Sequence, residues 1–141
     1  MIRDRLRRLL GRERAAPPSV APARPPAPPP EEIEVQLEIE GDELKRKVDS
    51  GLEPLFVDIR EPYEVAGGHV AGALIIPMNQ VPARLAEIPR DRTLIVYCAA
   101  GVRSYGVTHW LREQGYADTW SLVGGIYAWI DQGGELVTPA R

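Results

Sequence analysis

Cys98 is the residue of this sequence best suited to covalent chemistry, because it is the single cysteine of the 141-residue chain and opens a loop of small residues. The loop continues through Ala99, Ala100, Gly101, Val102, Arg103 and Ser104. Between a strand and a helix, such a loop can turn successive backbone N–H groups inward, and these form an anion cradle with the positive end of the helix dipole. A cysteine at the mouth of the cradle has a pKa of roughly 3.5–7.5, against about 8.5 for a free thiol. The pattern predicts a nucleophilic Cys98 that acts on an anionic group bound by positions 99–104.

The residues on either side of the loop predict the elements that hold it. Leu94 to Tyr97 is apolar and rich in β-formers, which indicates a strand covered on both faces. We expect a helix over Ser104–Gln114 with Ser104 as its N-cap, and an earlier strand over Leu55–Asp58. Strands and helices alternate, which predicts an α/β fold with a mostly parallel central sheet flanked by helices on both faces. Ligands bind outside the carboxyl ends of such strands, so Asp58 and Cys98 are expected at one rim.

The remaining patterns predict further elements around this sheet. Residues 33–39 alternate between apolar and polar side chains, as in a strand with one solvent-exposed face. Asp42 can cap a helix that follows this strand. The other expected elements are a short helix over Glu61–Ala66, a strand over Ala73–Ile76, a helix over Val81–Ile88, a strand over Thr119–Leu122 and a final helix over Ile126–Asp131.

The first 31 residues differ in composition from the rest. Residues 16–30 hold eight of the 14 prolines, which is typical of an extended spacer with polyproline II character. Residues 1–14 place Ile2, Leu6, Leu9 and Leu10 at helical spacing with arginines between them. This basic amphipathic segment is either a solubilising tail or an anchor that touches a membrane surface or a partner. We expect a disordered tail over residues 1–31 and a folded domain over residues 32–141.

The formal net charge of −3 conceals an asymmetry. Residues 1–30 carry seven arginines and two acidic residues, a charge of +5, whereas the rest of the chain carries −8. The acidic domain argues against nucleic acid as a partner, so attraction for an anionic substrate has to come from the loop amides and Arg103. A lone cysteine cannot form an internal disulfide, and the sequence has no run of about 18 apolar residues. We therefore expect a cytoplasmic protein.

At the Cys98 loop and in five further segments the sequence resembles the rhodanese family. Residues 58–64 are similar to the family's D-x-R-E-x-x-E segment, and residues 68–73 are similar to its G-H-I-P-G-A, with Ala71 where proline is usual. The other matches are Ile76-Pro77, Gly115-Tyr116 and residues 122–129, which resemble the closing L-x-G-G-x-x-x-W. All of these segments occur in the family's order, which makes the resemblance specific.

The resemblance implies a rhodanese-like fold and a sulfurtransferase that needs no metal or organic cofactor. In that chemistry the Cys98 thiolate takes a sulfane sulfur from a small anionic donor such as thiosulfate, and a cysteine persulfide forms. A thiol, cyanide or an acceptor protein then removes the outer sulfur. The resemblance assigns the loop amides to the negative persulfide, and Asp58 and Arg60 to support of the loop from the neighbouring strand end. Arg103 either binds the donor or braces the loop.

Two alternatives to a sulfurtransferase remain open. A cysteine phosphatase or arsenate reductase of the same fold would use the same thiolate, but such phosphatases resemble C-x5-R. Here only four residues separate Cys98 from Arg103, and the shorter loop fits one sulfur atom better than a tetrahedral phosphate. The second alternative is a persulfide carrier or interaction module with little turnover.

The two histidines and two of the three tryptophans lie in or near the matching segments, and we assign them structural roles. We expect His69 to brace a turn, His109 to be structural or exposed, and Trp120 and Trp129 to be core aromatics. A role as general base is the alternative for His69.

Overall fold

The computed structural model describes residues 36–139. The tail predicted over residues 1–31 lies outside the described residues, as does the start of the strand expected over residues 33–39. Within the described range, none of the helices combines the length and the hydrophobicity that a membrane-spanning segment requires.

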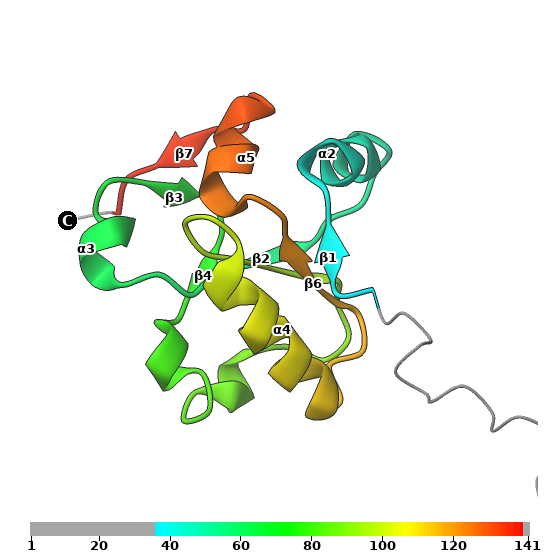
Figure 1. Cartoon of the computed structure of the whole chain (residues 1–141), viewed down its shortest axis with the longest axis vertical. Coiled ribbons are helices and arrows are strands. Elements are labelled where there is room, and N and C mark those ends of the chain that lie inside the picture. Colours follow the sequence, from blue (N-terminus) through cyan, green and yellow to red (C-terminus); the bar gives the residue numbers. More distant parts are fainter. Residues whose placement is uncertain (1–35, 140–141) are drawn as a thin grey trace, which may run out of the picture. The chain divides into compact units, whose positions relative to one another are not determined.

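A five-stranded sheet forms the centre of the domain (Figure 1). The strand order is β1 (Glu38–Ile39), β6 (Thr119–Leu122), β5 (Leu94–Tyr97), β2 (Leu55–Asp58) and β4 (Leu74–Ile75). Every neighbouring pair in this sheet is parallel. All four residues of the middle strand, β5, are buried, which explains its uninterrupted apolar sequence. The mostly parallel sheet predicted from the sequence is confirmed.

Helices cover both faces of this sheet, as predicted (Figure 1). The helices of the described chain are α2 (Gly41–Asp49), α3 (Pro62–Val65), α4 (Val102–Glu113) and α5 (Gly125–Asp131), with two 3-10 turns, η3 (Met78–Gln80) and η4 (Leu85–Glu87). α2 and α5 contribute Leu44 and Ile126 to the core on one face. α4 contributes Val107 and Leu111 to the core on the other face. Because β5 supplies side chains to both cores, the loop after it is anchored from both layers.

Three details of the predicted helices are wrong. α4 begins at Val102 with Gly101 as its N-cap, so Ser104 lies inside the first turn and does not cap the helix. Gly101 has a φ of 100°, a left-handed conformation that turns the chain into the helix earlier than the predicted cap. α2 likewise begins before Asp42, after Glu40. Residues 81–88 form a turn and η4 instead of a helix, and Ile88 is extended because it precedes Pro89.

One small sheet was not predicted. β3 (His69–Val70) pairs antiparallel with β7 (Leu136–Val137), near the end of the described chain. Each strand has two residues, which is too short for an alternating pattern to stand out in the sequence.

The sheet register brings the ends of β2 and β5 together. Asp58 lies opposite Tyr97, and the N–H of Ile59 donates to Tyr97 O at 3.2 Å. Because the two strands are parallel, the segment after Asp58 and the loop at Cys98 leave the sheet at the same edge.

Candidate active site

The Cys98 side chain is enclosed by the loop between β5 and α4. Only 1% of the residue is exposed, and the backbone N–H of Gly101 donates to Cys98 Sγ at 3.1 Å. Gly101 therefore supplies both a donor to the sulfur and the left-handed turn into α4. Ala99 is half-buried and Ala100 is exposed. Their side chains are methyl groups, so no long side chain at these two positions covers the outer edge of the loop.

Ser104 contacts the sulfur from the first turn of α4. Its fully buried hydroxyl lies 3.5 Å from Cys98 Sγ and donates to Gly101 O at 3.2 Å. The side chain that the sequence assigned to helix capping thus faces the candidate nucleophile.

The loop lowers the pKa of Cys98. Burial raises the pKa of the thiol, but hydrogen bonds from the Ser104 hydroxyl and from the backbone N–H groups of Ser104, Gly101 and Ala100 favour the thiolate and outweigh burial. The N-terminal end of the α4 dipole acts in the same direction. A thiolate stabilised in this way is the reactive form of cysteine, both as a nucleophile and as a leaving group.

The turn between β6 and α5 supports the loop from behind. The N–H of Ile126 donates to Cys98 O at 2.9 Å. A Cβ atom added at Gly125 would collide with the carbonyl groups of Cys98 and Ala99, and one added at Gly101 would lie 3.1 Å from Gly124 N. Glycine at these positions lets the two turns approach closely. The turn at Gly124-Gly125 therefore holds the Cys98 backbone in position.

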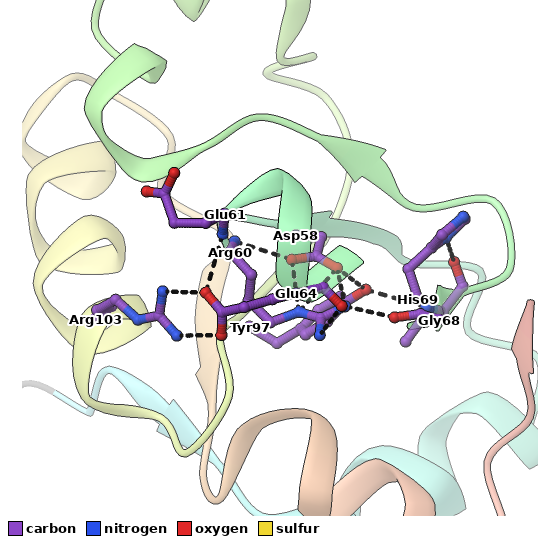
Figure 2. Close-up of polar contacts among 9 residues, drawn as sticks. Asp58, Arg60, Glu61, Glu64, Gly68, His69, Tyr97 and Arg103 are labelled. Carbon is purple, nitrogen blue, oxygen red and sulfur yellow. Dashed lines mark hydrogen bonds and ion pairs between the residues drawn. The ribbon is translucent and has the colours of Figure 1, made fainter. Parts of the chain in front are cut away.

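Arg103 forms a bidentate ion pair with Glu64 of α3 (Figure 2). Its Nη1 and Nη2 donate to Glu64 Oε1 and Oε2 at 2.8 and 2.9 Å. The Arg103 guanidinium lowers the pKa of Glu64 to about 2, and Glu64 raises the pKa of Arg103. Glu64 Oε1 also accepts the N–H of Glu61 at 3.0 Å in a capping box. Of the two roles that the sequence left open, this geometry favours bracing, because the guanidinium is already engaged.

Asp58 and Arg60 support this brace without touching the Cys98 side chain. Asp58 is fully buried and accepts Arg60 Nη2 at 2.8 Å and the Tyr97 hydroxyl at 2.7 Å (Figure 2). Arg60 Nη2 also donates to Gly68 O at 2.7 Å, and Nη1 donates to Glu64 O at 3.3 Å. The two residues therefore fix the segment that carries Glu64, and their support reaches the loop through the Glu64–Arg103 pair.

The remaining candidate residues lie outside the sulfur's hydrogen-bonding shell. His69 Nδ1 lies 2.9 Å from Val70 O, within the short β3 strand, and His109 pairs with Glu113 on the exposed side of α4. Trp129 packs edge-on against Phe56 in the core, and Trp120 lies half-buried beneath the Arg112 guanidinium. Among residues 36–139, no three His, Cys, Asp or Glu side chains are grouped so that they could hold a metal ion.

Comparison with known proteins identifies the family. Residues 40–132, about two thirds of the chain, match the family model of the rhodanese-like domain. The chain belongs to the rhodanese family. This rhodanese domain is 33% identical to the rhodanese-like domain protein from Staphylococcus aureus, with a TM-score of 0.66 over 75% of this chain and 100% of that one.

Two curated relatives of this chain are named for sulfur transfer. It is 41% identical over 102 residues to a sulfurtransferase from Allochromatium vinosum, covering 72% of this chain and 95% of that protein. It is 38% identical over 92 residues to the probable adenylyltransferase/sulfurtransferase MoeZ from Mycobacterium tuberculosis, covering 64% of this chain. The match spans only 24% of MoeZ, so it concerns one part of that larger protein. The relatives support sulfurtransferase activity at the level of the family.

Sequence reasoning missed two side chains that shape the rhodanese site. Glu64 stood in the matching segment at 58–64 but was not assigned to the site, and no local pattern pairs it with Arg103. Ser121, a buried serine of β6, lies 2.8 Å from Ser104 Oγ. Strand alternation places Ser121 on the same face of the sheet as Thr119, but its partner becomes visible only when α4 is packed on that face.

Proposed function

We propose that this rhodanese transfers a sulfane sulfur through a persulfide on Cys98. In the first step the Cys98 thiolate attacks the outer sulfur of thiosulfate, an S–S bond forms to Cys98, and sulfite leaves with the electrons of the broken S–S bond. In the second step cyanide or a thiolate attacks the outer sulfur of the persulfide and releases the Cys98 thiolate. With cyanide the product is thiocyanate. The cycle needs no external oxidant or reductant, and two-step covalent catalysis gives ping-pong kinetics.

The observation that carries the proposal is the loop around Sγ. The Gly101 N–H donates to Sγ at 3.1 Å, and the Ser104 hydroxyl, which lies 3.5 Å from Sγ and accepts the S–H of the thiol, can turn its proton toward a sulfur anion. The thiolate, the persulfide and the departing thiolate all carry negative charge, so donors that are already in place stabilise each of them without reorganisation. Four residues between Cys98 and Arg103 enclose one sulfur atom more readily than a phosphoryl group.

Arg103 has a bracing role in this proposal. Because its guanidinium is paired with Glu64, the donor anion is bound mainly by backbone amides of the loop. Both possible acceptors, a small thiol or cyanide and a cysteine of another protein, attack the same outer sulfur. If the acceptor is a small thiol or cyanide, turnover with small molecules should be fast, and if it is a cysteine of another protein, that turnover should be slow.

The test is the intact mass of the protein after treatment with thiosulfate, measured before and after addition of cyanide. We expect a gain of one sulfur atom that cyanide removes, and Cys98→Ser should show neither change while keeping the fold. Turnover of thiosulfate and cyanide by Cys98→Ser would refute the proposal. A persulfide that forms on wild-type Cys98 but reacts slowly with cyanide would favour the carrier function, with a protein acceptor.

A further inference from the structure

Ser121 is a residue of β6 that lies outside the Cys98 loop but next to Ser104. Both Ser104 and Ser121 are fully buried, and their hydroxyl oxygens lie 2.8 Å apart. The pair lies directly behind the sulfur, since Ser104 Oγ is also 3.5 Å from Cys98 Sγ. Ser104 Oγ thus has three polar neighbours, which are Cys98 Sγ, Gly101 O and Ser121 Oγ.

A serine hydroxyl has one proton to donate and two lone pairs to accept with. When Cys98 is a thiol, its S–H can donate to Ser104 Oγ, while Ser104 donates to Gly101 O. When Cys98 is a thiolate, the sulfur needs a donor, and Ser104 has to turn its only proton from Gly101 O to Sγ. Gly101 O keeps a partner after this change, because the N–H of Tyr105 also donates to it at 3.3 Å.

The role of Ser121 follows from this count of protons. If Ser121 donates the hydrogen bond to Ser104 Oγ, Ser104 does not use its own proton in that bond. The Ser104 proton then stays available for a hydrogen bond to the sulfur. The Ser121 hydroxyl also polarises the Ser104 O–H, and linked hydrogen bonds of this kind strengthen one another in a low-dielectric interior. Without it, a buried lone pair of Ser104 would lose its donor.

We propose that Ser121 is a positioning residue for sulfur transfer, whose hydroxyl donates to Ser104 so that Ser104 can donate to the Cys98 thiolate and to the inner sulfur of the persulfide. The proposal rests on the proposed persulfide chemistry for its function, but its chemical basis is the ionisation of Cys98. It can therefore be measured separately from turnover.

The charged groups around the loop do not take part in this relay. Arg103 of α4 is paired with Glu64 of α3, and Arg60 is paired with Asp58 at the end of β2. β6 (Thr119–Leu122) carries no charged side chain, and the only one on α5 (Gly125–Asp131) is Asp131, at its last residue. A change at Ser121 therefore alters the hydrogen-bond chain without removing a charge near Cys98.

The experiment measures the rate of Cys98 alkylation against pH in the full-length protein. The Ser121→Ala midpoint should rise by about half a unit, and the Ser104→Ala midpoint by about one unit or more. In the double variant Ser104→Ala/Ser121→Ala the loss of Ser121 should add nothing, because Ser121 acts through Ser104. Thr119→Val is the matched control: Thr119 is a buried hydroxyl of the same strand that donates to Tyr116 O at 2.8 Å. Its midpoint should equal that of wild type.

A second pair of variants keeps the test decisive if Ser121→Ala does not fold. Ser121→Thr retains the hydroxyl, and Ser121→Val replaces it by a side chain of the same shape as threonine but without a hydroxyl. Only the valine variant should therefore raise the midpoint of Cys98 alkylation. An unchanged midpoint in Ser121→Ala or Ser121→Val would overturn the proposal. So would an equal rise from Ser121→Ala in the presence and in the absence of Ser104. Persulfide formation by wild type, read from intact mass, tests the proposed function independently of these outcomes.

Discussion

Replacing Glu64 by glutamine tests whether the ion pair with Arg103 holds the active-site loop in place. The substitution keeps the size of the side chain and an oxygen that can accept the Glu61 N–H, but it removes the charge that Arg103 contacts at 2.8 and 2.9 Å. Arg103 would then keep at most a neutral partner in a partly buried position.

The size of the effect follows from the pKa of Glu64, which lies at about 2 in the folded protein against an ordinary value of 4.5. Each unit of this difference is worth about 1.4 kcal/mol, so the full shift corresponds to about 3 kcal/mol of stability. Because 32% of the Arg103 side chain is exposed, solvent screens part of the interaction. We expect the free energy of unfolding of Glu64→Gln to be lower by about 2 kcal/mol near neutral pH.

The same pKa predicts how this difference depends on pH. A carboxylate whose pKa is lower in the folded than in the unfolded protein stabilises the fold at pH values above the unfolded-state pKa, which is 4.5 for Glu64. The stabilisation is lost as pH falls toward the folded-state pKa of about 2. Urea unfolding of wild type and Glu64→Gln should therefore differ most above about pH 5 and converge in acid. Glu87→Gln is the control, since Glu87 pairs with Arg84 at an exposed site and should change stability little. Equal stability of wild type and Glu64→Gln near pH 7, or a difference that does not shrink in acid, would refute the reasoning.

The kinetics of Glu64→Gln separate the two roles of Arg103. If Arg103 braces the loop, kcat/KM for thiosulfate should fall, because the amides around Cys98 lose their fixed position. A rise in kcat/KM would show instead that a freed Arg103 binds the donor anion.

Three further predictions concern the loop itself. The alkylation rate of wild-type Cys98 should titrate below about 8.5, the value of a free thiol, and a midpoint at or above it would mean that the loop does not stabilise the thiolate. Gly125→Ala should lower both the melting temperature and sulfur transfer, because its Cβ would collide with the carbonyl groups of Cys98 and Ala99; wild-type values in both assays would contradict the close packing of the two turns. Inserting one glycine after Ala100 should abolish thiosulfate turnover because the amides would no longer converge on one sulfur. If wild type hydrolyses p-nitrophenyl phosphate faster than it transfers sulfur, loop length does not discriminate the two chemistries.

Much of the site could be predicted because its parts are local in sequence. Cys98, the small residues after it and the apolar strand Leu94–Tyr97 are consecutive, and the segments that resemble the rhodanese family are short and ordered. The parallel sheet was also predictable, because alternating strands and helices leave few ways to cover a sheet on both faces. Local sequence therefore singled out the candidate nucleophile, and it predicted the strand–loop–helix unit that carries Cys98 and the edge of the sheet at which Cys98 lies.

Tertiary structure alone decided which side chains complete the site. Arg103 meets a carboxylate 39 positions earlier in the chain, and Ser104 meets a hydroxyl 17 positions later, so no local pattern could choose between donor binding and bracing. The need for glycine at the start of α4 also comes from packing, because a Cβ at position 101 would lie 3.1 Å from Gly124 N, in the turn between β6 and α5. The sequence supplied the reactive group, whereas its ionisation and its supports depend on contacts between elements that folding brings together.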